Sequence, residues 1–224
     1  MPPPLQKLPG RPLLYLITSG ETTVRTTAAS EAFANVLQLI QSAVAAGIDL
    51  VQIREKNLSA SVLYQLSASA ARITQASATK LLVNDRSDIA VAAAADGVHL
   101  TTASLPASAV REAFGAEFII GVSTHSLAEA GSACRSGADF LVFGPVFDTA
   151  SKSEYGEPAG IENLARVCSE LSPFPVLALG GVTTDNAADC IHAGAAGIAA
   201  IRLLNDRLQL DRVVNEIHEG VGNR

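Results

Sequence analysis

The stretch AAGIDLVQIREK, residues 45–56, contains the pattern that decides the fold. Its alanines are typical of a helix end, and Gly47 is the residue that most readily takes the left-handed conformation of a helix C-cap. A short apolar run, 50–53, follows at once and ends in charged residues. The same order of helix end, glycine and apolar run recurs in SGADFLVFG (136–144) and HAGAAGIAAI (192–201). The repeat predicts helices that alternate with buried parallel strands.

Eight apolar runs of about four to six residues fit this pattern along the chain. Eight strands that alternate with helices predict an α/β fold, a single (β/α)8 TIM barrel over residues 13–224, because right-handed crossovers between parallel strands close such a sheet. An open, doubly wound sheet is the alternative. The proline-rich residues 1–12 are predicted to form a flexible N-terminal arm. The expected strands are 13–17, 50–53, 80–83, 97–100, 118–122, 140–143, 176–179 and 197–201.

Ala-rich stretches with helical spacing lie between these runs, and several follow a residue suited to cap a helix N-terminus. The expected helices include 31–46, 59–78, 126–136, 161–171 and 184–193, with Ser30, Ser59, Ser126 and Thr184 as candidate caps.

Composition and charge exclude several classes of protein. Of the 224 residues, 48% are apolar and 17% are charged, which suits a large buried core, and the net charge of −6 argues against a nucleic-acid binder. The three cysteines lack metal-ligand spacing and are expected to be reduced core residues. The chain has no signal-peptide pattern and no apolar run long enough for a membrane span. We therefore expect a soluble, cytoplasmic protein that binds neither nucleic acid nor membrane.

A barrel carries its chemistry at the carboxyl ends of its strands, and polar residues lie there in this sequence. Gln52, Arg54 and Lys56 follow the second strand, and alternation directs them to one side, opposite Ile53 and Glu55. This arrangement suits a clamp for phosphate or diphosphate, although an exposed loop with ordinary ion pairs is an equal alternative.

The third and fifth strands also end in polar residues. Asn84 and Asp85 follow the third strand, and Ser123 and His125 follow the fifth. His125 either packs and caps the next helix or carries protons at the barrel mouth. His99, at the end of the fourth strand, is expected to make a structural hydrogen bond.

Two anion subsites are predicted at the mouth. The loop after the sixth strand carries Thr149, Ser151 and Lys152, which together with Arg54 and Lys56 form a cationic subsite. The second subsite is built from backbone N–H groups, as barrels commonly bind phosphate after the seventh and eighth strands. Its expected residues are Gly180, Gly181, Ile201 and Arg202.

The motifs VQIREK, VNDR, DGVHL, GVSTHSLAEA, DFLVFGPVFDTASK and PVLALGGVTTDNAADCIHAGAAGIAAI resemble the thiamine-phosphate synthase and thiazole tautomerase family over residues 13–204. The resemblance implies a transferase that joins hydroxymethylpyrimidine diphosphate to hydroxyethylthiazole phosphate and releases diphosphate. A homodimer is also possible.

The resemblance also implies roles for the residues named above. Gln52 holds the aminopyrimidine, and Ser123 lies beside the pyrimidine and the leaving group. Gly181 and the backbone at Ile201 hold the thiazole phosphate. The diphosphate is stabilised by Arg54, Lys56, Asn84, Thr149, Ser151 and Lys152.

The implied Mg²⁺ site departs from the family pattern. The family holds the ion between two aspartates, and Asp85 matches the first, but Ser104 stands where the second is expected. Losing a carboxylate ligand weakens Mg²⁺ binding without abolishing it, because diphosphate and water also supply oxygens. Arg202 is a second departure, since the family commonly has a small residue there; it either strengthens the phosphate contact or intrudes on it.

These departures keep two alternatives open. A thiazole tautomerase moves a proton on a thiazole carboxylate phosphate without a metal, and His125 matches its acid/base histidine. Gln52, Lys56 and Asp85 instead favour the synthase, which we take as the main hypothesis. A non-catalytic protein that binds thiamine precursors is the third possibility.

Overall fold

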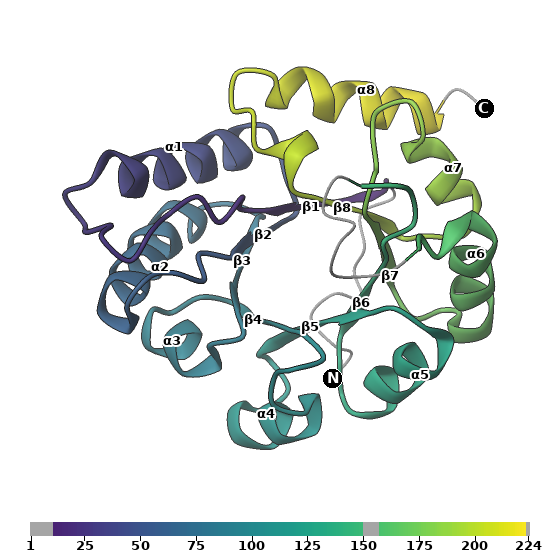
Figure 1. Cartoon of the computed structure of the whole chain (residues 1–224), viewed down its shortest axis with the longest axis horizontal. Coiled ribbons are helices and arrows are strands. Elements are labelled where there is room, and N and C mark those ends of the chain that lie inside the picture. Colours follow the sequence, from purple (N-terminus) through teal and green to yellow (C-terminus); the bar gives the residue numbers. More distant parts are fainter. Residues whose placement is uncertain (1–10, 150–156, 223–224) are drawn as a thin grey trace.

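The fold is a closed barrel of eight parallel strands, each hydrogen-bonded to its neighbours in chain order. The structure, a computed structural model, describes residues 11–149 and 157–222. The helices form a ring outside the strands (Figure 1). The strands are β1 (Leu13–Ile17), β2 (Leu50–Ile53), β3 (Lys80–Asn84), β4 (Gly97–Leu100), β5 (Ile119–Thr124), β6 (Phe140–Phe143), β7 (Val176–Leu179) and β8 (Gly197–Ala200). The predicted (β/α)8 barrel is confirmed.

The helices follow the strands as predicted, although those predicted at 59–78 and 184–193 are shorter in the structure. They are α1 (Glu31–Ala45), α2 (Ala60–Thr74), α3 (Ser87–Ala92), α4 (Ala107–Phe114), α5 (Leu127–Arg135), α6 (Gly160–Leu171), α7 (Ala187–His192), the 3₁₀ helix η1 (Arg202–Leu204) and α8 (Leu210–Gly222). No helix among the described residues is long and apolar enough to cross a membrane.

Helix ends test the capping predictions. Gly47, Gly137 and Gly194 follow their helices at φ of 74°, 92° and 96°, so the predicted left-handed caps are confirmed. Ser59 and Ser126 each accept a hydrogen bond from the backbone N–H three residues on. Ser30 occupies the N-cap position of α1 as predicted, but its side chain makes no capping hydrogen bond, and the prediction of Thr184 as a cap is wrong.

Both differences from the prediction have local causes. The hydroxyl of Ser30 accepts from the N–H of Thr27 in the preceding turn rather than from its own helix. The helix expected to begin after Thr184 begins after Asn186, whose side-chain oxygen accepts from the N–H of Thr183.

Two hydrophobic cores lie on opposite sides of the barrel wall. The outer core joins strands to helices, and the inner core fills the barrel. Alternation along each strand separates the two sets, because successive side chains point to opposite faces. The inner core contains Leu13, Tyr15, Ile17, Leu50, Leu82, Ile119, Phe140, Val142, Leu177 and Ala199.

A repeated carboxylate closes the amino end of the barrel. Asp49, Asp96 and Asp139 immediately precede β2, β4 and β6. Each carboxylate accepts a hydrogen bond of 2.7–2.9 Å from a backbone N–H of the preceding strand, which is β1, β3 and β5 respectively. Each is also paired with a cation, and Asp49 binds both terminal nitrogens of Arg11 at 2.9 Å. Residue 11, which we assigned to the flexible arm, is therefore attached to the barrel; most of that arm, 1–10, lies outside the described residues.

Candidate active site

The inner face of the barrel leads directly to polar side chains at its carboxyl end. Leu50, Leu82 and Ile119 belong to the inner core, and the last inward position of each of these strands is polar. Alternation therefore directs Gln52, Asn84 and Ser123 into the mouth. The predicted strand-end residues are brought together by the fold.

Gln52 is fixed by a partner that the sequence analysis missed. Its side-chain nitrogen donates to the hydroxyl of Tyr15 at 2.7 Å, and both side chains are buried. Burial raises the pKa of Tyr15, so the phenol stays protonated. Tyr15 is hidden in the sequence because it lies within the apolar run LLYLI, where an aromatic residue indicates only core.

His99 makes the predicted structural hydrogen bond, and its partner is Ser123. The ring Nε2 lies 2.8 Å from the Ser123 Oγ, and the histidine is 2% exposed. Burial and, to a smaller extent, the charge of Arg54 lower the pKa of His99 to about 3. His99 is therefore neutral at physiological pH.

Ser123 lies within a strand, which corrects the prediction that it follows one. β5 extends to Thr124 because Ser123 and Thr124 pair with Val142 and Phe143 of β6. The predicted end at residue 122 relied on apolar character, but pairing of the backbone continues regardless of side-chain polarity. Ser123 is consequently held as rigidly as the barrel wall.

The side chains that follow β2 point to different sides, as alternation predicts. Glu55 is 3% exposed and its carboxylate accepts from the hydroxyls of Thr18 and Thr22, each at 2.6 Å, which ties the loop after β1 to the barrel. Arg54 is half-buried, and its charge acts on His99 within the barrel. Lys56 is exposed in the turn that follows.

Asp85 is an exposed carboxylate at the end of β3 with an unusual backbone. Its φ of 63° is a left-handed conformation that is uncommon outside glycine, although aspartate and asparagine adopt it more readily than most residues. Ser104, the second predicted metal ligand, accepts from the N–H of Thr101 at 2.8 Å and lies 3.1 Å from its hydroxyl, so it holds its own loop. In the ranges 11–149 and 157–222, no three His, Cys, Asp or Glu side chains gather as a metal-binding group.

The predicted phosphate subsite is a tightly packed turn. A Cβ on Gly181 would lie 2.5 Å from the carbonyl oxygen of Asp148 and 2.7 Å from the Cβ of Phe147. Only glycine therefore fits beneath the segment that follows β6. Ile201 packs against the inner core from the end of β8.

Arg202 begins the 3₁₀ helix η1 and connects two loops. Its guanidinium donates to the hydroxyl of Thr149 at 3.1 Å, which joins the segment after β8 to the segment after β6. Ser151 and Lys152, predicted for the same loop, lie outside the described residues.

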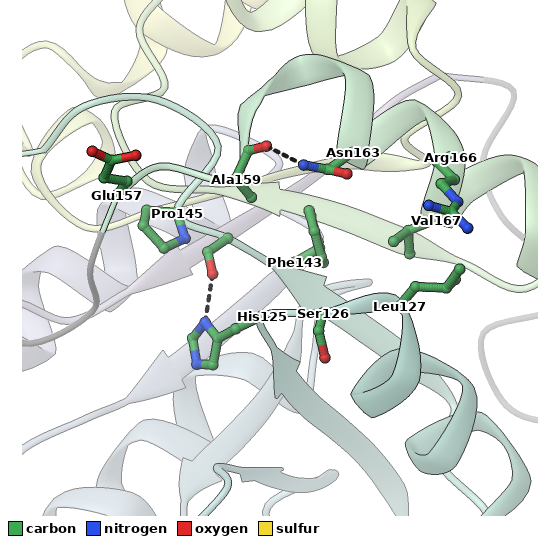
Figure 2. A pocket seen from close by; sticks show the side chains of 11 residues that line it. His125, Ser126, Leu127, Phe143, Pro145, Glu157, Ala159, Asn163, Arg166 and Val167 are labelled. Atoms are coloured by element: carbon green, nitrogen blue, oxygen red, sulfur yellow. Dashed lines mark hydrogen bonds between the residues drawn. The ribbon is translucent and has the colours of Figure 1, made fainter.

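His125 faces a pocket between α5 and α6. Its Nδ1 is hydrogen-bonded to the carbonyl oxygen of Gly144, so Nδ1 carries the proton (Figure 2). Asn163 and Arg166 of α6 line the same pocket. The ring therefore lies against the backbone that follows β6.

Comparisons with known proteins agree with this arrangement. The family model described as thiamine monophosphate synthase matches residues 14–204. A putative thiamine-phosphate synthase of Geobacter sulfurreducens is 46% identical over 167 residues, 75% of this chain and 78% of that protein. The thiamine-phosphate synthase of Moorella thermoacetica is 40% identical, over 74% of this chain and 78% of its own.

A solved structure supports the same assignment. The thiamine phosphate pyrophosphorylase from Pyrococcus furiosus superimposes with a TM-score of 0.76 at 29% identity, covering 94% of this chain and 95% of its own. The matched segment contains every strand except the first residue of β1, and it includes the mouth residues described above. The chain belongs to the thiamine monophosphate synthase family.

Proposed function

We propose that this protein forms thiamine phosphate from hydroxymethylpyrimidine diphosphate and hydroxyethylthiazole phosphate. The observation that carries the proposal is the joint presence of Gln52, Arg54 and Ser123 at one barrel mouth, together with the relatives named thiamine-phosphate synthase. In the proposed reaction the bond between the pyrimidine methylene carbon and the diphosphate oxygen breaks, and its electron pair leaves with diphosphate. The thiazole nitrogen then uses its lone pair to bond the pyrimidine-methyl cation.

The chain's own groups suit a reaction limited by the leaving group. The guanidinium of Arg54 brings a fixed positive charge to the mouth, where water is partly excluded and a charge acts more strongly than in bulk solvent. The hydroxyl of Ser123 and the amide of Asn84 add donors to diphosphate oxygens. We assign Lys56, Thr149, Ser151 and Lys152 to the same anion, and Gly180, Gly181, Ile201 and Arg202 to the thiazole phosphate.

Gln52 suits recognition of the aminopyrimidine. Because its nitrogen already donates to Tyr15, its carbonyl oxygen remains to accept from an exocyclic amino group. The buried pair with Tyr15 holds the amide plane still, so that a ring without this amino group would leave the oxygen without a partner.

The donor set at β3 suits a Mg²⁺ ion that arrives with its substrate. Mg²⁺ is usually held by one or two carboxylates plus substrate phosphates and water, and Asp85 offers one exposed carboxylate beside the Asn84 amide. Ser104 would contribute a hydroxyl only by giving up bonds to Thr101. When bound, the ion would neutralise charge on the departing diphosphate.

The thiazole tautomerase is the second candidate. The Nδ1–H bond of His125 to Gly144 leaves the lone pair on Nε2, as an acid/base histidine requires. The close relatives named as synthases favour the first candidate.

The deciding experiment measures thiamine phosphate formed from the two purified precursors, with and without Mg²⁺. Mg²⁺-dependent turnover supports the synthase. No turnover by a protein that still binds thiazole phosphate refutes it, and aromatisation of the thiazole carboxylate phosphate would then assign the tautomerase.

A further inference from the structure

His99 is a buried polar side chain to which the proposed reaction gives no direct task. It lies inside the barrel between two aromatic rings, with ring centroids 5.6 Å from Tyr15 and 6.0 Å from Phe140. Burying an imidazole among aromatic rings costs free energy unless its nitrogens are satisfied. Only one of them is: Nε2 contacts Ser123, whereas Nδ1 is buried without a hydrogen-bond partner within the described part of the chain.

The orphaned nitrogen indicates which tautomer is present. Nδ1 lies against the backbone of Gly121, since a Cβ built on that glycine would be 2.7 Å from it. If Nδ1 carried the proton, a buried N–H would have no acceptor, and such orphaned donors are rarer in proteins than under-satisfied acceptors. The proton therefore belongs on Nε2, which donates to the Ser123 oxygen.

This assignment fixes the direction of the serine hydroxyl. An oxygen that accepts from His99 cannot at the same time direct its own hydrogen toward that nitrogen. Within residues 11–149 and 157–222, the contact with His99 is the only hydrogen bond of the Ser123 side chain. The hydroxyl hydrogen is thus left to point into the mouth.

We propose that His99 is a positioning residue, which holds the hydroxyl of Ser123 so that its hydrogen is donated to a diphosphate oxygen. This inference rests on the proposed synthase function. A donor that is already oriented needs no reorganisation when charge develops on the leaving group. Burial supports it, because a histidine whose pKa is lowered to about 3 keeps the same neutral tautomer throughout the physiological range.

Three substitutions of one residue separate this role from a packing role. The amide nitrogen of glutamine reaches about where Nε2 lies, that of asparagine reaches about where Nδ1 lies, and leucine offers no donor. We expect His99→Asn and His99→Leu to lower kcat about 10–100-fold, the range typical for residues that orient a functional group. His99→Gln should recover most of that loss, and the KM for thiazole phosphate should not change in any variant.

A double-mutant cycle with Ser123→Ala tests whether His99 acts through the serine. If it does, adding His99→Asn to Ser123→Ala causes no further loss of kcat. An equal additional loss would overturn the proposal, as would wild-type kcat in His99→Asn. Ile119→Val, a conservative change in the inner core two residues from Gly121, controls for general loosening of the barrel.

Binding of inorganic diphosphate with Mg²⁺, measured by calorimetry, gives a readout that does not need turnover. Here His99→Asn and Ser123→Ala should weaken binding by the same factor, while His99→Gln should bind as the wild type does. Equal affinities in His99→Asn and His99→Gln would overturn the positioning role. Absence of thiamine phosphate formation by the wild type would instead overturn the proposed function, so the two failures are distinguishable.

Discussion

Replacing Gly121 by alanine should destabilise the barrel and disturb its mouth together. The glycine lies on the inner face of β5, where a Cβ would meet Phe140 Cζ at 2.4 Å and His99 Nδ1 at 2.7 Å. Carbon atoms in contact prefer about 3.5–4.0 Å, so each neighbour would have to move by about 1 Å. Neither moves easily, since Phe140 is fully buried and its ring packs edge-on against Tyr15 at 5.5 Å.

The expected loss follows from two opposing effects. Overpacking a well-filled core costs about 1–3 kcal/mol, and two contacts this short favour the upper end. Replacing glycine in a strand recovers up to about 1 kcal/mol, because alanine loses less conformational freedom on folding. The net loss is therefore about 2 kcal/mol, which for a chain of this size lowers Tm by about 4–8 °C.

Thermal and urea denaturation measure this loss, and a second glycine supplies a matched control. Gly220 lies inside α8, and a Cβ there would meet nothing within 4 Å. Gly220→Ala should therefore stabilise the protein by about 0.5–1 kcal/mol. A Tm for Gly121→Ala equal to or above that of the wild type would refute the steric argument.

A double variant identifies the clash itself. Phe140→Leu removes the ring atoms closest to the new methyl group, so Gly121→Ala should cost less in that background than in the wild type. Strict additivity of the two free energies of unfolding would contradict the assigned contact. The kcat of Gly121→Ala should also fall, because the new methyl group displaces the imidazole of His99, which holds the hydroxyl of Ser123.

Three further predictions concern the rim and the base of the barrel. Asp85→Asn removes the charge but keeps a side chain that tolerates φ of 63°, so Tm should not change. The Mg²⁺ concentration for half-maximal activity should rise about tenfold or more. An unchanged Mg²⁺ requirement would remove Asp85 as a ligand. Arg202→Ser removes a cation that is exposed and bonded to Thr149, so the KM for thiazole phosphate should rise about fivefold, or about 1 kcal/mol; a lower KM would mean that the arginine intrudes. Arg111→Met removes the cation that lies 2.7 Å from the Asp139 carboxylate, whose side chain is only 3% exposed. The free energy of unfolding, measured in urea, should fall by about 3–5 kcal/mol. A fall below about 1 kcal/mol would contradict this.

The fold could be predicted because its signal is local. An apolar run after a glycine cap needs only a few neighbouring residues to be recognised, and the predicted limits of β1, β2, β4, β6 and β7 agree with the structure. The limit of β5 was wrong because Ser123 and Thr124 are polar and stay in the strand through backbone pairing alone. Composition indicates burial, whereas pairing depends on the neighbouring strand.

The contacts of the site could be predicted only in part, because they join distant segments. The sequence indicated that His99 makes a hydrogen bond, but its partner lies 24 residues away on the next strand. Arg202 and Thr149 are 53 residues apart and meet only because β6 and β8 lie near each other in the closed barrel. Neither pairing has a signal in residue spacing, since the first depends on the register of β4 against β5 and the second on how two loops meet above the barrel.

The polar groups of the site are neutral inside the barrel and charged at its exposed rim. This difference predicts which positions tolerate substitution. Tyr15, Gln52 and His99 are buried and uncharged, so replacing any of them by an apolar residue breaks a hydrogen bond inside the barrel and disturbs the groups that we propose contact the pyrimidine ring. Asp85 and Arg202 are exposed, where water compensates for a lost charge at little cost. The two departures from the family pattern, Ser104 and Arg202, both lie at this rim. We therefore expect them to change the affinity for Mg²⁺ and thiazole phosphate while the chemistry held by the buried groups stays the same.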